Sequence, residues 1–192
     1  MSAATAGDHS DTAAPSAWMR RFAPLVPSGA RVLDLAAGGG RHARLFAAQG
    51  AHVLAVDRDA GALAGLDGIA GVTIRVADLE GAPWPFGGEV FDAIVVANYL
   101  HRPLFPHLLA SLALDGAFLY ETFAIGNERF GRPSNPAFLL APDELLDLVR
   151  GRLTLVAFEQ GLVEGERFAV VQRVAAVGRA RAWPPPLPQR GG

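Results

Sequence analysis

Three consecutive glycines directly after a short apolar segment constrain the fold of this chain more than any other feature. The segment Arg31–Leu35 (RVLDL) has the apolar density of a strand that is buried on both faces. Gly38, Gly39 and Gly40 then allow backbone angles and a close ligand approach that a Cβ atom would block. A helix is expected from about Arg41, so its first N–H groups point back at the glycines. We therefore predict a strand, a turn and a helix that bind a ligand at the turn.

Asp34 lies at the carboxyl end of this expected strand and narrows the choice of ligand. In open α/β sheets, ligands bind at the carboxyl ends of the strands. A carboxylate there repels a pyrophosphate and attracts a cationic amino group. The charge therefore favours a zwitterionic or cationic cofactor.

Length and composition limit the chain to one domain. With 192 residues, 51% of them hydrophobic, it can bury one large core but not two. The formal net charge of −2 indicates no basic surface, so neither nucleic acid nor an anionic membrane is an expected partner. All 17 basic residues are arginine, which excludes lysine Schiff-base chemistry. The lack of cysteine excludes disulfides, thiolate nucleophiles and cysteine-based metal sites, and we predict no metal.

The two ends of the chain differ in composition from its middle. Residues 1–15 are rich in Ala, Ser, Thr, Asp and Gly, contain no apolar leader, and are expected to be disordered. Residues 16–177 are expected to form the folded domain, and the proline-rich residues 178–192 a flexible tail. No apolar run approaches the roughly 20 residues of a membrane span, so the sequence predicts a cytoplasmic protein.

Two further strands are expected along the chain, and an acid follows each of them. Residues 51–56 are predicted as a second buried strand before Asp57, and residues 72–76 as a third strand before Asp78. Right-handed crossovers place the carboxyl ends of consecutive parallel strands at one edge of a sheet. Asp34, Asp57 and Asp78 are therefore expected to face one crevice. There Asp57 binds a ribose diol, caps the following helix, or does both.

Groups with useful proton chemistry follow at the same edge. Residues 91–97 are predicted as a fourth strand, and residues 117–123, after an Asp-Gly turn, as a fifth. His101 is the first candidate for a general base because its ordinary pKa near 6.5 suits neutral pH, with Tyr99 and Glu121 behind it. Each has a structural alternative: the histidine caps or packs, the tyrosine forms a wall, and the glutamate pairs with an arginine.

Two loops interrupt the alternation of strands and helices. Residues 124–138 are dense in Arg, Asn, Gly and Pro, and loops of this length in a compact domain commonly bind or cover a substrate. Arg129 and Arg132 could form a fork for a carboxylate or oxyanion substrate, although a solvated or paired arginine is the more frequent case for either alone. Residues 79–89 are a second ordered loop, whose aromatic side chains could form the wall of an adenine site.

Together these segments resemble the class I S-adenosylmethionine (SAM)-dependent methyltransferases. The resemblance rests on VLDLAAGGGRH (residues 32–42), Asp57, the Asp78-Leu79 pair and FDAIVVAN (residues 91–98), and it runs from about residue 30 to residue 174. It implies an α/β fold, a three-layer Rossmann-like sandwich around a seven-stranded, mostly parallel sheet with an antiparallel C-terminal hairpin strand. The short connection expected between strands at 153–158 and 168–177 requires such a hairpin.

The resemblance also implies SAM as the cofactor and a role for each matching residue. The acid of the first strand would face the methionine amino group, the second acid the ribose hydroxyls and the third the adenine. The residues placed against the cofactor are Asp34, Ala36, Gly38, Gly40, Asp57, Arg58, Asp78, Leu79 and Asn98. Ala36 and Ala37 depart from the family pattern, and a methyl group at either position fits if the backbone there avoids positive φ.

The expected function is methyl transfer from SAM to a small-molecule acceptor, because no basic groove for a macromolecule is visible. Two alternatives stay open. A SAM-binding sensor or partner protein would use the same cofactor residues without catalysis. An NAD-dependent oxidoreductase would explain why residues 38–43 match the loose G-x-G-x-x-G/A pattern, but Asp34 and Asp78 oppose it. The acceptor and the oligomeric state do not follow from the sequence.

Overall fold

Strands and helices alternate along most of the chain, and the computed structural model describes residues 14–164 and 167–187. The strands are β1 (Arg31–Leu35), β2 (His52–Asp57), β3 (Val72–Val76), β4 (Phe91–Ala97), β5 (Leu112–Phe123), β6 (Thr154–Val163) and β7 (Ala169–Val177). The α-helices are α1 (Ala17–Phe22), α2 (Arg41–Ala48), α3 (Ala60–Leu63), α4 (Phe105–Ala110) and α5 (Glu144–Val149). Short 3-10 helices are η1 (Ala23–Leu25), η2 (Ala64–Leu66), η3 (Arg102–Leu104), η4 (Asn127–Arg129) and η5 (Pro136–Phe138).

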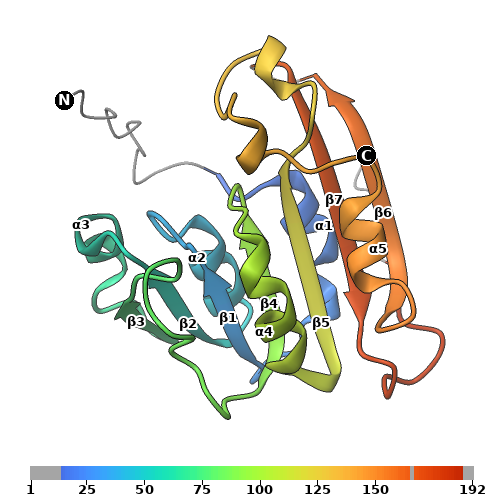
Figure 1. Cartoon of the computed structure of the whole chain (residues 1–192). Helices are drawn as coiled ribbons and strands as arrows, with labels where there is room; N and C mark the ends of the chain where they lie inside the picture. Colours follow the sequence, from blue (N-terminus) through green and yellow to red (C-terminus); the bar gives the residue numbers. More distant parts are fainter. Residues whose placement is uncertain (1–13, 165–166, 188–192) are drawn as a thin grey trace.

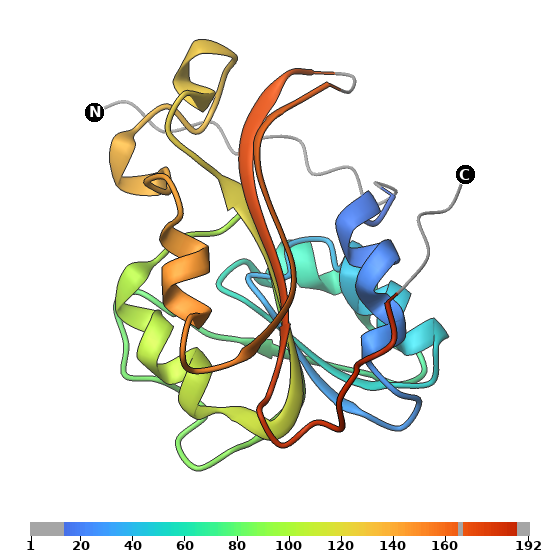
Figure 2. The same cartoon turned by 90° about the vertical axis from the view of Figure 1, so that its right-hand side faces the viewer.

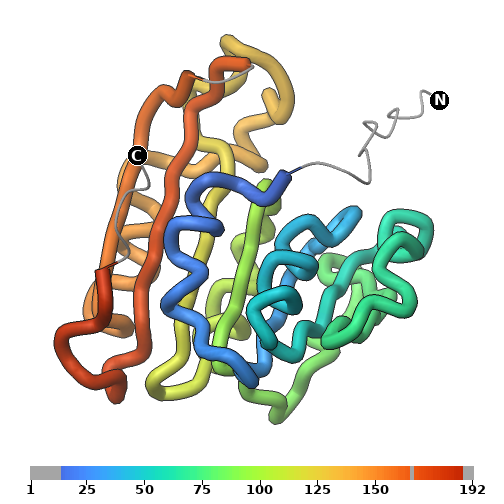
Figure 3. Tube along the Cα trace, turned by 180° about the vertical axis from the view of Figure 1, so that it is seen from behind, coloured from blue at the N-terminus to red at the C-terminus, as the bar shows by residue number. Residues whose placement is uncertain are grey.

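The strands form one sheet of seven strands in the order β3-β2-β1-β4-β5-β7-β6 within the described ranges. The pairs from β3 to β5 are parallel, whereas β7 is antiparallel to both β5 and β6. Helices cover both faces, α4 and α5 on the side facing the viewer in Figure 1 and α1 and α2 on the side seen in Figure 3. The predicted three-layer sandwich with an antiparallel C-terminal hairpin is confirmed.

Two apolar clusters fill the spaces between the sheet and its helices, and Figure 2 shows the twisted hairpin of β6 and β7 from the side. Trp18 and Phe22 of α1 pack with Phe46 of α2 on one face. On the other face, Phe118 packs with Leu145 of α5. β1 and β4 contribute buried residues to both clusters, which is the burial that their apolar density predicts. Among the described helices, none has the length and apolar character needed to cross a membrane.

β5 begins five positions earlier than the predicted start, at Leu112 instead of Ala117. The register changes between the pairs Phe91–Leu112 and Ala93–Ala117, so β5 carries extra residues opposite β4. The predicted Asp115-Gly116 turn is therefore an irregular stretch within a strand. Its carbonyl groups need partners, and they find them in the segment after β7.

The chain directly after β7 is docked on this irregular stretch. The N–H of Gly178 donates to Gly116 O at 2.8 Å, and that of Ala180 donates to Leu114 O at 2.9 Å. Arg181 donates to Asp115 O at 2.8 Å and to the carbonyl of Leu25, the last residue of η1, at 2.9 Å. The prediction of a flexible tail from residue 178 is thus wrong for residues 178–181. Residues 188–192, and residues 1–13 of the segment predicted to be disordered, lie outside the described residues.

Candidate cofactor and acceptor site

Three acids meet at the carboxyl edge of β1, β2 and β3, as the sequence predicts. Parallel pairing aligns Asp34 of β1 with Ala55 of β2, and Asp57 at the end of β2 with Val76 at the end of β3. Asp78 follows β3 and is exposed. The shared edge is a direct result of the parallel order, because all three strands run in the same direction.

Asp34 is the most perturbed of the three acids. Its carboxyl is 1% exposed, and burial raises its pKa to about 7, against smaller opposing effects of the Ala43 N–H and the Arg41 charge. Among the described residues, its Oδ2 atom has no hydrogen-bond partner. A buried carboxylate oxygen without a partner is costly, and a cationic group bound beside it removes that cost. Asp34 therefore fits the amino group of a SAM-like cofactor.

Asp57 holds the glycine turn in place. Its Oδ2 accepts the N–H of Gly38 at 2.8 Å, and its Oδ1 accepts the N–H of Asp59 at 3.0 Å. The helix cap that the sequence allowed for Asp57 belongs instead to Asp59, whose Oδ1 accepts the N–H of Gly61 at 2.8 Å. Asp57 is thus left at the strand end with acceptor lone pairs for a ribose diol. Arg58, between the two acids, is exposed.

Ala36 adopts the backbone conformation that a side chain disfavours. Its φ is 53°, in the left-handed region, whereas Ala37 is not among the positive-φ residues of the described chain. An alanine fits without strain only where the backbone avoids positive φ. Ala37 meets this condition and Ala36 does not. Gly38 and Gly40 also have positive φ, of 53° and 74°, so left-handed conformations recur through the turn.

Ala36→Gly is expected to increase the free energy of unfolding by about 0.5 kcal/mol. A non-glycine residue in the left-handed region costs about 1–2 kcal/mol, and the greater freedom of glycine in the unfolded chain cancels part of the gain. Ala37→Gly is the matched control and is expected to destabilise by about 0.5–1 kcal/mol. Urea denaturation of both variants tests this, and equal destabilisation by the two changes would contradict strain at Ala36.

Asp78 and Leu79 follow β3 with different surroundings. Backbone N–H groups of Glu80 and Gly81 donate to Asp78 and hold its pKa below the usual range, with smaller help from Arg58 and His101. Leu79 is 7% exposed and packs in the apolar cluster under α4. An ionised Asp78 at the rim and an apolar residue beside it are the partners that the amino edge and the face of an adenine require.

The aromatic residues of loop 79–89 face the core and not the crevice. Trp84 stacks on His107 of α4 with ring centroids 5.4 Å apart, and its Nε1 donates to Ser111 Oγ at 3.3 Å. Phe86 is fully buried in the cluster under α4. The hypothesis that these rings form the wall of an adenine site is therefore wrong. The pattern of aromatic residues cannot by itself distinguish a ligand wall from core packing.

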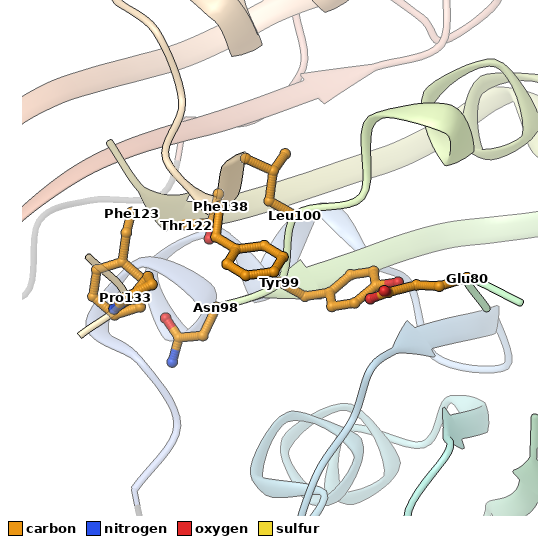
Figure 4. A pocket seen from close by; sticks show the side chains of 8 residues that line it. All are labelled: Glu80, Asn98, Tyr99, Leu100, Thr122, Phe123, Pro133 and Phe138. Carbon is orange, nitrogen blue, oxygen red and sulfur yellow. The ribbon is translucent and has the colours of Figure 1, made fainter. Parts of the chain in front are cut away.

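A cavity of about 190 Å³ lies beside the acidic edge, where β4 and β5 end (Figure 4). Asn98 and Tyr99, both predicted site residues, line it. Asn98 has a φ of 55°, a conformation that asparagine tolerates better than most residues, and its N–H donates to Glu121 O at 3.0 Å. The lining residues are Glu80, Asn98, Tyr99, Leu100, Thr122, Phe123, Pro133 and Phe138.

Tyr99 forms a wall of this cavity rather than a base. Its hydroxyl lies beside the Glu80 carboxylate, and burial together with that negative charge raises its pKa well above the usual range. The phenol therefore stays protonated at neutral pH. The buried hydroxyl of Tyr120 donates to Tyr99 O at 2.8 Å, which fixes the backbone at this point.

The other two candidate bases, His101 and Glu121, do not line the cavity. His101 is half-buried and lies near enough to Asp78 to lower the pKa of that acid. Glu121 is buried, with its Oε2 atom 3.2 Å from Nε of Arg173, which is the arginine pairing that the sequence left as its alternative. General-base catalysis by either residue stays a prediction.

The loop after β5 reaches the cavity through residues that the sequence did not single out. Arg129 and Arg132 are exposed and do not line it, so no arginine fork forms there. Pro133 and Phe138 line it instead. The sequence missed Glu80, Leu100, Thr122, Phe123, Pro133 and Phe138. The sequence offered one indication for three of them. Glu80, Leu100 and Thr122 each directly follow a predicted site residue, namely Leu79, Tyr99 and Glu121.

Comparisons with known proteins agree with this geometry. The family of methyltransferase domains matches residues 32–113. A demethylmenaquinone methyltransferase of Clavibacter sepedonicus is 37% identical over 94 residues, which are 45% of this chain and 36% of the relative. TehB from Haemophilus influenzae has a TM-score of 0.75 at 18% identity, covering 88% of this chain and 64% of TehB. A SAM-dependent methyltransferase from Mesorhizobium loti has a TM-score of 0.64 at 19% identity, covering 84% of this chain and 98% of that one.

The chain spans about a third of the length of the curated relative and about two thirds of TehB. The match to TehB covers 88% of this chain, while the family match, over residues 32–113, includes the three acids and the glycine turn. Residues 32–113 are thus similar to methyltransferase domains, and the chain has the fold of solved SAM-dependent methyltransferases.

Proposed function

We propose that this protein transfers the methyl group of SAM to a small, uncharged acceptor with a largely apolar body. The observation that carries the acceptor class is the lining of the cavity beside Asn98. Leu100, Phe123 and Phe138 provide apolar and aromatic walls, and no cationic side chain of the described residues lines the cavity. An anionic acceptor would lack a partner there, whereas an apolar one gains by leaving water.

The residues at the strand ends fit the cofactor. Asp34 would hold the amino group, Asp57 the ribose hydroxyls, and Asp78 with Leu79 the adenine, while Asn98 lies between this edge and the cavity. When bound, SAM supplies a methyl group that is already activated on a sulfonium. The protein then has to orient the acceptor towards that methyl group and exclude water.

A proton has to leave only if the acceptor atom carries one when it attacks. Glu80 contributes the one carboxylate among the residues that line the cavity. Tyr99 beside it stays protonated and can donate a hydrogen bond to an acceptor oxygen or nitrogen. We propose Glu80 as the group that takes the proton of a hydroxyl or amine acceptor.

Asp57→Ala is expected to weaken binding of S-adenosylhomocysteine by about thirtyfold or more, because each hydrogen bond to a charged group contributes about 1.5–3 kcal/mol. Calorimetric titration measures this, with NAD run alongside. Asp59→Ala is the matched control, because Asp59 also accepts backbone N–H groups but caps α3 away from the diol. It is expected to bind like the parent protein. Binding of NAD in place of S-adenosylhomocysteine would overturn the cofactor assignment.

The acceptor class is tested by pairs of compounds that differ in one charged group. Phenols and aromatic amines are expected to be methylated, and the matching carboxylates are expected not to be. Demethylmenaquinone, named in the curated relative, belongs in the panel. Cofactor binding without methylation of any compound would favour a SAM-binding sensor over an enzyme.

A further inference from the structure

Arg102, directly after His101 and at the start of η3, joins two parts of the chain that are far apart in sequence. Its Nε lies 2.6 Å from Glu144 Oε1, and its Nη2 lies 2.9 Å from Glu144 Oε2. The same guanidinium donates to two carbonyls of the loop before α5, from Nη1 to Ala137 O at 2.8 Å and from Nη2 to Leu139 O at 2.9 Å. A planar guanidinium can make such a set of contacts, and a lysine cannot.

Glu144 is itself held in place by the backbone. Its Oε2 accepts the N–H of Ala141 at 2.8 Å. Burial opposes ionisation of Glu144, but the hydrogen bonds from Arg102 and Ala141 outweigh it and leave the pKa below the usual range. The pair is therefore ionised at neutral pH. Because the Glu144 side chain is partly buried, at 21% exposure against 40% for the exposed Arg102, the contacts are screened less than those of a fully exposed pair.

Phe138 is the residue between Ala137 and Leu139, whose carbonyls Arg102 binds. It lines the cavity beside Asn98, which is called the acceptor cavity below. On its other side, the chain is fixed to the end of β5, where the N–H of Leu140 donates to Phe123 O at 3.0 Å. Phe123 also lines the cavity. The short segment with Phe138 is thus bound to η3 through Arg102 and to the end of β5 through Leu140.

We propose that Arg102 and Glu144 are a positioning pair that holds Phe138 as a wall of the acceptor cavity. The pair sets the affinity for the acceptor without touching the cofactor residues. This inference rests on the proposed function for its effect on the acceptor. Its structural part, the immobilisation of the segment around Phe138, is independent of the reaction.

Arg102→Met is expected to raise the KM for the acceptor by about tenfold and to leave the affinity for S-adenosylhomocysteine unchanged, because small displacements of a substrate wall have effects of this size. Arg102→Lys keeps the charge but not the planar fork, and it is expected to raise KM by about threefold or more. Arg152→Met is the matched control. Arg152 also donates to a carbonyl, that of Leu148 at 2.8 Å, but away from the cavity, so KM is expected to stay unchanged.

Hydrogen exchange separates this inference from the proposed function. The amides of Phe138 and Leu139 donate to Asn135 and Pro136, so their exchange reports the order of the segment. Arg102→Met is expected to accelerate their exchange by about tenfold or more, with little change in the core strands. Unchanged exchange in folded Arg102→Met and Arg102→Lys would overturn the proposal. If no acceptor is methylated, accelerated exchange still supports the positioning role while the proposed function fails.

A double variant distinguishes positioning from general stabilisation. In a Phe138→Ala background the wall is already absent, so Arg102→Met is expected to have no further effect on KM. A KM effect of the same size in both backgrounds would show that Arg102 does not act through Phe138 and would overturn the proposal.

Discussion

Asp34→Asn is expected to stabilise the protein at about pH 8 while it weakens cofactor binding by about thirtyfold or more. The pKa of Asp34 is about 7 in the folded protein, against an ordinary value of 3.8. The raised value means that the protonated form is favoured on folding. Stability from this group is fully present below about pH 4 and is lost as the pH rises through about 7. The full loss corresponds to about 4 kcal/mol, as an upper bound for this buried group.

The neutral amide of asparagine has no such pH dependence. Its oxygen can still accept the Ala43 N–H, and no charge has to be buried. We expect Asp34→Asn to be more stable than the parent by about 2 kcal/mol near pH 8, with the difference shrinking as the pH falls from 7 to 4. Urea denaturation at several pH values measures it. Asp78→Asn, at an exposed acid, is the control and should show no such gain.

Cofactor binding is expected to respond in the opposite direction. A cationic amino group next to Asp34 favours the carboxylate, so binding near neutral pH releases a proton and weakens as the pH falls below about 7. The amide lacks the charge and loses a hydrogen bond worth about 1.5–3 kcal/mol. Calorimetry with S-adenosylhomocysteine in buffers of different ionisation enthalpy counts the protons. A variant that is less stable at pH 8 and binds as well as the parent would contradict this account of Asp34.

Gly40→Ala is expected to destabilise the protein by about 2–5 kcal/mol, and the matched Gly38→Ala by only about 1–2 kcal/mol. Both glycines have positive φ, of 74° and 53°, so each alanine carries the strain of the left-handed region. They differ in the space around them. A Cβ at Gly40 would lie 2.6 Å from Cγ of the buried Leu66, whereas a Cβ at Gly38 has no atom within 4 Å. Overpacking adds about 1–3 kcal/mol at Gly40 alone.

Urea denaturation of the two variants separates backbone strain from overpacking, because both variants carry the strain and only Gly40→Ala is overpacked. Leu66→Ala in the Gly40→Ala background provides a second control, since it opens the space that the new methyl group needs. Part of the loss from Gly40→Ala is then expected to be recovered. Equal destabilisation by Gly40→Ala and Gly38→Ala would show that close packing of Leu66 on the turn does not matter.

The sequence by itself determined the parts of this protein that depend on local pattern and chain topology. β1 and β4 have the predicted bounds because each apolar run is followed at once or after two residues by Asn98 or the glycines 38–40. Asp34, Asp57 and Asp78 could be placed at one edge because parallel strands with right-handed crossovers leave no other arrangement. The C-terminal hairpin followed from the shortness of its connection.

The tertiary structure alone decided which side chains meet at that edge. Glu121 of β5 pairs with Arg173 of the neighbouring strand β7, and Arg102 reaches Glu144, 42 positions away in the sequence. Nothing in the local pattern selects these partners, because periodicity gives the face of an element and not its neighbour. The strain at Ala36 also could not be predicted from the residue itself. Its positive φ follows from the position of the turn, which is set by Asp57 and α2 rather than by the preference of alanine. Contacts between segments that are distant in the sequence, and not residue type, therefore determine which loop residues line the acceptor cavity.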